Sequence, residues 1–152
     1  DNSGQLRIYD KKGETRSYLG DGYLQAYNQF GERTIFLGTG TNGGGYLRTY
    51  NFSGQESIYV GTGADSSGQI RIYDNTGETG SFLGSGYFRT YNRFGKMTTF
   101  IGNATDGGGY LRTNNKFETE TAFLGTNNAN EGLINLNDKF GQSFWIRLNK
   151  KN

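Results

Sequence analysis

One short phrase recurs along nearly the whole chain of 152 residues, and it constrains the fold more than any single residue does. The phrase reads Gly, any residue, aliphatic, any two residues, Tyr or Asn, Asp or Asn, any two residues and Gly, and it closes on aromatic–aliphatic–Gly. Its copies open at intervals of 18 or 23 residues, at Gly4, Gly22, Gly45, Gly68, Gly86, Gly109 and Gly132. Fixed periods of this length are typical of repeat proteins, in which each unit is one supersecondary element that needs its neighbours.

A longer period lies over the short one, because Gly68 follows Gly4 by 64 residues and Gly132 follows Gly68 by 64. We therefore predict a single repeat domain over residues 1–152, with super-repeats at 3–66 and 67–130 and a C-terminal capping repeat at 131–152. The last copy departs from the pattern in Phe144–Leu148, which is more apolar and contains the only Trp. Terminal repeats are often atypical because they cap the array.

Each copy carries a turn signature between two runs of alternating residues. In the first copy, Asp10-Lys11-Lys12-Gly13 predicts a type I turn with a three-residue hairpin loop and a bulge, since Gly tolerates positive φ and Asp can bond its own backbone. The same signature recurs at Asn28–Gly31, Asn51–Gly54, Asp74–Gly77, Asn92–Gly95 and Asp138–Gly141. The turn at Asn115–Glu118 has Glu where Gly belongs, which predicts a strained or altered turn.

Counting outward from the turn predicts the register, with Asp10 opposite Glu14, Ile8 opposite Arg16 and Leu6 opposite Tyr18. One face of every hairpin then pairs an aliphatic residue or Phe on the first strand with an aromatic residue on the second, and we expect this face to be the core. The first set is Leu6, Leu24, Leu47, Ile70, Phe88, Leu111 and Ile134. The second set is Tyr18, Phe36, Tyr59, Phe82, Phe100 and Phe123.

The opposite face of the first strands repeats Tyr and Arg, and it is the best candidate for a functional surface. Its residues are Tyr23, Tyr27, Tyr46, Arg48, Tyr50, Arg71, Tyr73, Tyr87, Arg89, Tyr91, Tyr110 and Arg112. Tyr rings with Arg donors suit sugars or protein contacts, and Arg stacked on Tyr also suits simple packing or a subunit contact. Basic side chains interleaved with aromatic ones can bind single-stranded nucleic acid, but a net charge of only +2 argues against that partner.

The joints between hairpins are of two kinds. Leu19–Gly22 and Leu83–Gly86 are tight, and Gly-Asp or Gly-Ser there fits a two-residue mirror-image hairpin turn. The joints at Thr39–Gly44, Thr62–Ser67, Asn103–Gly108 and Thr126–Glu131 are longer and permit a change of sheet. We therefore predict an all-β fold of seven tandem β-hairpin repeats that form a β-solenoid or prism-like stack, with three hairpins per 64 residues.

The sequence offers little to catalysis or to metals. It contains no His and no Cys, which removes the usual general base and the thiolate ligands. Glu14, Glu32 and Glu78 share one repeat position, so turn electrostatics explains them more simply than glycoside hydrolysis. The Gly-rich segments Asn42–Gly45 and Asp106–Gly109 lack the Lys of a phosphate loop and the spaced acids of a calcium loop. We predict no enzymatic activity, no cofactor and no metal.

The environment of the chain is indicated only weakly. No run of 18 apolar residues exists, so we expect no insertion into a membrane. Asn51-Phe52-Ser53 and Asn103-Ala104-Thr105 match the glycosylation acceptor pattern, which arises easily by chance in a chain rich in Asn, Ser and Thr. The sequence begins at Asp1 without Met or a hydrophobic leader, as expected of a processed mature chain or of part of a longer one.

The phrases Gly44–Asn51 and Gly108–Asn115, with the turn and the closing Leu-Gly or Val-Gly, resemble the Gly-rich β-repeats of phage tail fibres and bacterial surface filaments. This resemblance implies an elongated fibre shaft, frequently trimeric, exposed outside the cell or on a virion. Choline-binding cell-wall repeats have a similar length and hairpin plan, but they cage their ligand with paired Trp residues, and this chain has one Trp.

Two functions remain open. The first is a structural subunit of an extracellular or virion fibre, non-enzymatic and self-associating into a homo-oligomer or filament. The second is a lectin-like module in which each repeat offers an equivalent Tyr/Arg pocket to a cell-surface glycan, with avidity across the copies. Burial of the Tyr/Arg face by a neighbouring subunit would favour the fibre, and its exposure in the assembled state would favour the lectin.

Overall fold

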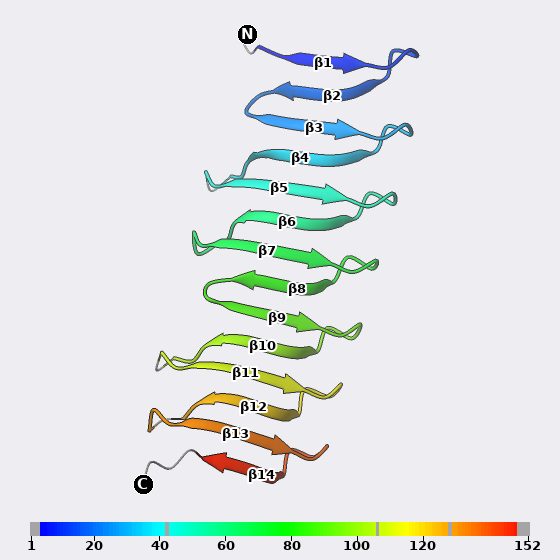
Figure 1. The fold of residues 1–152 in the computed structure, drawn as a ribbon. Coiled ribbons are helices and arrows are strands. Elements are labelled where there is room, and N and C mark those ends of the chain that lie inside the picture. The colour runs from blue at the N-terminus through cyan, green and yellow to red at the C-terminus, as the bar shows by residue number, and fades with distance from the viewer. Residues whose placement is uncertain (1–3, 42, 106, 128, 149–152) are drawn as a thin grey trace. The chain divides into compact units, whose positions relative to one another are not determined.

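The protein is all-β and is built of hairpins, as predicted. The computed structural model describes residues 4–41, 43–105, 107–127 and 129–148, with side chains up to residue 145, and it contains no helix in these ranges (Figure 1). The chain divides into two compact units, residues 1–78 and 79–152, and each is described by itself. Residues 1–2 and 149–152 of the predicted domain lie outside the described residues, as does Ser3 at the start of the first super-repeat.

Within each unit, every strand pairs antiparallel with its neighbours in sequence. The first unit contains β1 (Leu6–Tyr9), β2 (Thr15–Gly20), β3 (Tyr23–Tyr27), β4 (Arg33–Thr39), β5 (Gly45–Tyr50), β6 (Glu56–Thr62) and β7 (Gly68–Tyr73). The second unit contains β8 (Thr79–Gly84), β9 (Tyr87–Tyr91), β10 (Met97–Asn103), β11 (Gly109–Asn114), β12 (Glu120–Thr126), β13 (Gly132–Asn137) and β14 (Ser143–Leu148).

The prediction of a solenoid or prism within the chain is wrong, because each unit is a single open layer and its sheet does not change at the longer joints. These joints are tight turns rather than slack connections. Between β6 and β7, the Gly63 amide donates to the Ser67 carbonyl at 2.7 Å and the Ser66 amide donates to the Gly63 carbonyl at 3.0 Å. Pairing therefore continues directly, with Thr62 opposite Gly68. Residues 42, 106 and 128, inside three of these joints, lie outside the described residues.

The two short joints are mirror-image turns, as predicted, but one residue later than Gly-Asp and Gly-Ser. The central residues are Asp21 and Gly22, with φ of 52° and 79°, and Ser85 and Gly86, with φ of 50° and 80°. Gly20 remains paired with Tyr23 and belongs to its strand. Two consecutive positive φ values match the right-handed twist of the flanking strands, which is why this turn suits a two-residue connection.

The recurring turn has the predicted hydrogen bonds. In the first copy, the Gly13 amide donates to the Asp10 carbonyl at 3.0 Å, and the Asp10 amide donates to the Glu14 carbonyl at 2.9 Å. The Asp10 carboxylate accepts from the amides of Lys12 at 2.8 Å and Glu14 at 3.0 Å, and Gly13 has a φ of 83°. The side chain at the first position thus holds the turn rigid, while Gly supplies the left-handed backbone.

Glu118 confirms the expectation of strain in the sixth copy, because it adopts a φ of 66° where the other copies have Gly. Its carboxylate accepts from the Met97 amide at 3.0 Å and pairs with the Lys96 ammonium at 3.1 Å. Both contacts come from the preceding hairpin, and they lower the pKa of Glu118, the amide more than the ammonium. The strained turn is therefore held by a link between hairpins.

The predicted register of the strands is wrong by one residue beyond the first pair. Tyr9 lies opposite Thr15, but Ile8 lies opposite Ser17, so Arg16 is the extra residue of a β-bulge. One extra residue turns the rest of the second strand over. Tyr18 consequently faces the same side as Arg7, and Leu6 lies opposite Leu19 instead. The bulge recurs in every hairpin whose register is described.

This shift places the aliphatic residues and the aromatic rings on opposite faces of the sheet, although we expected them to share one face. One face, the aliphatic face, carries a row of cross-strand neighbours running Leu6, Leu19, Leu24, Leu37, Leu47, Val60 and Ile70 in the first unit. In the second unit the row runs Leu83, Phe88, Ile101, Leu111, Leu124 and Ile134. The other face, the aromatic face, carries the rings and the arginines.

The recurring step from ring to Gly in the second strands has a packing reason. A Cβ on Gly61 would lie 2.5 Å from the Tyr46 Cβ, and one on Gly125 would lie 2.4 Å from the Tyr110 Cβ. The ring two residues earlier also leans over the Gly, as Phe36 does over Gly38. Only a residue without a side chain fits there, because the space is filled by aromatic groups from its own strand and its neighbour.

We expect Gly61→Ala to lower the free energy of unfolding by about 1–3 kcal/mol, the usual cost of an overpacked site. Gly68→Ala is the matched control, since a Cβ there meets nothing within 4 Å. Urea denaturation followed by circular dichroism measures both. Equal stability of the two variants would contradict the close packing of rings on Gly.

The stability contributed by Glu118 should depend on pH. Its folded pKa lies below the ordinary value, so the contribution is present above the ordinary Glu pKa and is lost as the pH falls through the folded pKa. Denaturation near neutral and at acidic pH should therefore show a smaller loss of stability in Glu118→Gln than in the parent chain. An identical acid dependence in the two proteins would refute the link from Glu118 to Lys96 and Met97.

Candidate functional site

Stacked rings cover the aromatic face in each unit. In the first unit, neighbouring centroids lie 5.1–5.8 Å apart along Tyr18, Tyr23, Phe36, Tyr46 and Tyr59. In the second unit, they lie 4.7–5.6 Å apart along Phe82, Tyr87, Phe100, Tyr110 and Phe123. Among the described side chains, Tyr18 and Phe100 are the most buried hydrophobic ones, at 7% and 5% exposure. The core of this thin protein is therefore a column of rings on one side of the sheet.

Arginines lie over these rings. The Arg89 guanidinium carbon is 4.2 Å from the Tyr87 centroid and 5.4 Å from the Phe100 centroid, and Arg48 lies similarly over Tyr46 and Tyr59 at 4.7 and 5.5 Å. The Nε atom of Arg89 is buried and has no hydrogen-bond partner among the described residues. Cation–π attraction to the two rings offsets the cost of burying the Arg89 guanidinium without a hydrogen bond to Nε.

The twelve candidate residues from the first strands all lie on this face and are half-buried. Four of the tyrosines belong to the ring stacks: Tyr23, Tyr46, Tyr87 and Tyr110. The sequence prediction missed the rings of the second strands, which it assigned to the opposite face. The signal that could have found them is the Gly two residues after each ring. Counting the extra residue of the bulge after each turn would have placed these rings on the aromatic face.

A polar hollow interrupts the aromatic face of the first unit. Its volume is about 630 Å³, and Arg48, Arg71, Glu56, Gln69 and Tyr73 contribute polar groups to its lining. The hollow exists because Gln69 occupies the position that Tyr46 holds in the preceding hairpin, so the ring stack ends at Tyr59.

Charge and burial act together at this hollow. Arg48 pairs with Glu56 at 3.4 Å. Burial, and then the Glu56 carboxylate, raise the pKa of Tyr73, so this phenol remains a hydrogen-bond donor throughout the neutral range. The hollow thus places two cationic side chains, a carboxylate and a neutral phenol around one space.

The hairpin tips form a second surface, which the sequence prediction did not identify. Most copies have Phe in the turn, at its third residue in four copies and at its second in one. These side chains are strongly exposed, at 64–86%: Phe30, Phe94, Phe117 and Phe140 at the third position, and Phe52 at the second. In the second unit each tip also has a cation beside the ring, with Arg93, Lys116 and Lys139 lying 4.8–4.9 Å from the adjacent centroid. The recurring basic–Phe pair in the turn was the available signal.

Hydrogen bonds connect successive tips of the second unit. The Asn115 amide group donates to the Lys139 carbonyl at 3.1 Å, and Asn92 donates to the Lys116 carbonyl at 3.5 Å. The first turn residue of one hairpin thus fixes the position of the next tip. The three Phe side chains consequently form a registered row rather than independent loops.

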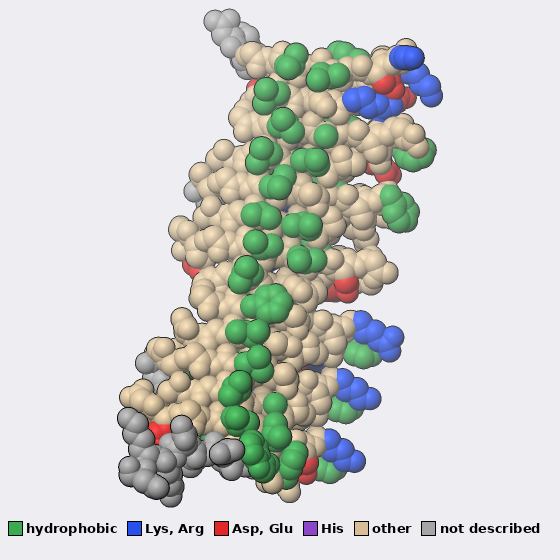
Figure 2. Space-filling view, viewed as in Figure 1, with side chains coloured by type: hydrophobic (Ala, Val, Ile, Leu, Met, Phe, Trp, Pro, Cys, Tyr) green, Lys and Arg blue, Asp and Glu red, His purple; other side chains and the backbone are tan. Residues whose placement is uncertain are grey.

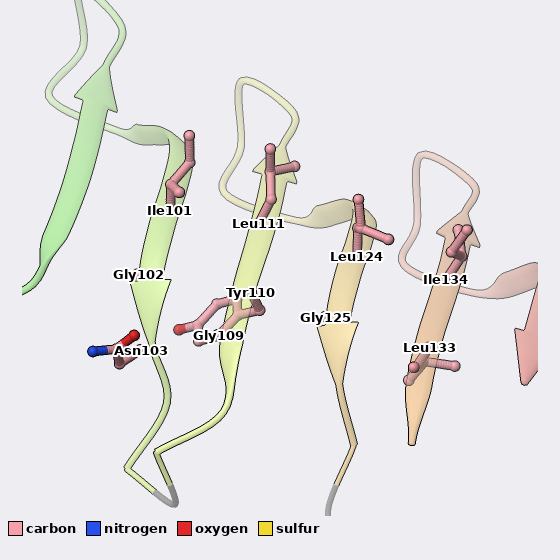
Figure 3. Close-up of a pocket in the computed structure, with 11 residues that line it drawn as sticks. Ile101, Gly102, Asn103, Gly109, Tyr110, Leu111, Leu124, Gly125, Leu133 and Ile134 are labelled. Carbon is pink, nitrogen blue, oxygen red and sulfur yellow. The ribbon is translucent and has the colours of Figure 1, made fainter. Parts of the chain in front are cut away.

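The aliphatic face is the third surface, and it lies open to solvent. Leu19, Leu37 and Leu124 are 50–52% exposed, and Ile101 is 45% exposed. Figure 2 shows a band of hydrophobic side chains across the strands of each unit. Next to the row, Gly replaces a side chain near the joints, leaving shallow hollows of about 640 Å³ in the first unit and 840 Å³ in the second. In the second, Ile101, Leu111, Leu124 and Ile134 lie in a row across four neighbouring strands (Figure 3).

Other kinds of site find little support in the part of the chain that the structure describes. Among these residues, no three His, Cys, Asp or Glu side chains gather in a way that could hold a metal ion. None of the described segments is a helix of sufficient length and hydrophobicity to cross a membrane. Comparison with protein-family models and with curated proteins found no match to this chain.

The arginines should matter for stability only where they cover the ring stack. We expect Arg89→Ala to lower the free energy of unfolding by about 1–2 kcal/mol, because it removes both cation–π attraction and packing of the arginine stem. Arg93→Ala, at an exposed tip, should cost less than about 0.5 kcal/mol. Urea denaturation distinguishes the two positions, and a reversed order would contradict the packing role of the Arg ladder.

Proposed function

We propose that this chain is a structural subunit of an extracellular or virion filament, without enzymatic activity, and that its copies associate through the aliphatic face. The exposed aliphatic face carries this proposal. Its row contains no charged residue from Leu6 to Ile70 in the first unit or from Leu83 to Ile134 in the second. Monomeric proteins rarely expose continuous apolar patches of this kind, so such a face marks an interaction surface.

The energetics support burial of this face by another layer. Covering the exposed half of a Leu side chain contributes about 1 kcal/mol, so covering a row of such residues can offset part of the entropy of association. The aromatic face already has its own cover of rings and arginines, which leaves the aliphatic face as the surface in need of a partner.

The resemblance to repeats of tail fibres and surface filaments agrees with this role. Each unit repeats one hairpin in sequence order, so a subunit of this kind supplies ladder hydrogen bonds along the direction in which its strands succeed one another. The half-buried Tyr/Arg residues contribute rigidity in this proposal, not a reactive group. Its exposure on a cell or virion surface follows from the same resemblance.

Sedimentation velocity on the full chain tests the proposal. We expect concentration-dependent oligomers from the parent chain and a shift toward monomer in Leu37→Glu/Leu124→Glu, which places two charges in the aliphatic row. Gln55→Glu is the charge control, because Gln55 is an exposed residue after the turn and other copies have Glu there. A parent chain that stays monomeric at all concentrations would refute the proposed function.

Carbohydrate binding is the second candidate, and the polar hollow beside Arg48 is the observation that favours it. Rings with planar donors and a carboxylate suit the hydroxyl groups and flat faces of a sugar. A glycan-array screen tests it with Arg48→Ala as the variant and Arg112→Ala as the control, since Arg112 does not line that hollow. Retention of all glycan signals in Arg48→Ala, or their absence from the parent chain, would exclude this site.

A further inference from the structure

Two apolar surfaces at opposite edges of the second unit complement each other. One is the tip row of Phe94, Phe117 and Phe140, which recurs at every second strand on the turn side. The other is the trough along the joint side of the aliphatic row, where Gly109 and Gly132 lie on the floor, also two strands apart. Neighbouring strands are about 4.8 Å apart, so both surfaces repeat at roughly 9.6 Å.

The shapes fit as well as the spacing. Each tip presents an exposed ring beyond the end of the strands. Figure 2 shows hydrophobic and basic side chains together along the turn edge. The trough is open where Gly109 and Gly132 carry no side chain, beside the aliphatic side chains of Leu111 and Ile134 (Figure 3). A ring from another molecule can enter this space without displacing any side chain of the row.

The charges of the two edges are also complementary. Each ring of the tip row has a cation beside it, on Arg93, Lys116 or Lys139. Among the described residues of the joint segments 102–109 and 125–132 there is no Lys or Arg, and the exposed Glu131 lies there. A tip seated in the trough therefore brings its cation close to the exposed Glu131 carboxylate.

We infer that a second copy of this chain docks edge-to-face on the first. Its tip row is seated in the trough of the first copy, and the basic side chains of its tips lie beside Glu131. This inference rests on the proposed function and names the contact through which the copies associate. Three rings at about two-thirds exposure supply on the order of 400 Å², taking 150–250 Å² per aromatic side chain. That is about half of the ~800 Å² that one partner contributes to a standard interface, and the flanking side chains add to it.

The contact is heterologous, because tip and trough are different surfaces. Edge-to-face docking at an angle leaves the trough of the second copy free for the tips of a third. Repetition closes into a ring of three or more copies or continues as an open helix. A two-fold sandwich of aliphatic faces, in contrast, stops at the dimer and leaves the rings of the tips outside the interface.

Engineered cysteines test this arrangement cleanly, since the chain has none of its own. Lys116 and Glu131 lie toward opposite ends of strands of about 20 Å, too far apart for a bond within one chain. Under mild oxidation, Lys116→Cys/Glu131→Cys should form covalent species of three or more chains on a non-reducing gel. Each single variant should give at most a trace of dimer.

The outcomes separate the inference from the function on which it depends. A covalent ladder that stops at the dimer, or an assembled chain that forms no Lys116→Cys/Glu131→Cys bond, would overturn edge-to-face docking while leaving self-association intact. A parent chain that is monomeric in sedimentation would instead remove the proposed function. These two failures cannot be confused, because the oligomeric state is measured without the cysteines.

A second variant keeps the test independent of disulfide geometry. Phe94→Ser/Phe117→Ser/Phe140→Ser should weaken self-association at least tenfold without altering the circular dichroism of the sheet. Thr76→Ser, at a tip without an aromatic ring, is the matched control. If Phe117→Cys reacts with maleimide equally fast in assembled and dissociated protein, the tips are free for another ligand such as an anionic glycan, and the inference fails.

Discussion

Everything in this structure depends on the extra residue that the recurring turn inserts into the second strand of every hairpin whose register is described. The first turn residue accepts two backbone amides, the fourth adopts a left-handed backbone, and the residue that follows the first strand pair is left unpaired. Because side chains alternate between faces, this single residue decides the side on which every later ring lies. Without it, leucines and rings would mix on both faces. With it, the sheet has one aliphatic face and one aromatic face.

The asymmetry of the two faces explains how so thin a protein can hold together. A single layer has no second sheet to bury its side chains, so one face must provide cover from its own residues. Rings lean over glycines, rings stack on rings from the next strand, and arginines lie across the outside. The aliphatic face has no such cover, since Leu side chains are too short to fold back over one another. Only the aliphatic face therefore exposes a continuous apolar surface that a partner could cover.

The sequence allowed the local structure to be predicted well and the side of each ring poorly. Hairpins, turn positions and the strained Glu118 follow from short-range chemistry, in which an Asp or Asn and a Gly three residues later suffice. The face on which each residue of the second strand lies depends on whether Arg16 is paired or bulged out. The strand propensity of the residues does not decide between these two alternatives. The longer joints looked slack because they are rich in Gly, yet Ser66 and Gly107 adopt the left-handed backbone of a tight turn. The Tyr/Arg surface was found from its periodicity, whereas the tip phenylalanines were not, because a turn position is usually read for its backbone role alone.

The pairing of each strand only with its neighbours in sequence has a consequence for how such a chain is made and changed. No contact within a unit has to wait for a distant segment to be synthesised, so hairpins can form one after another as they emerge from the ribosome. A whole copy inserted into or removed from the gene would leave the bonds of the remaining copies as they are. Length is then a property that recombination between repeats can adjust, while the cross-section of the subunit stays the same.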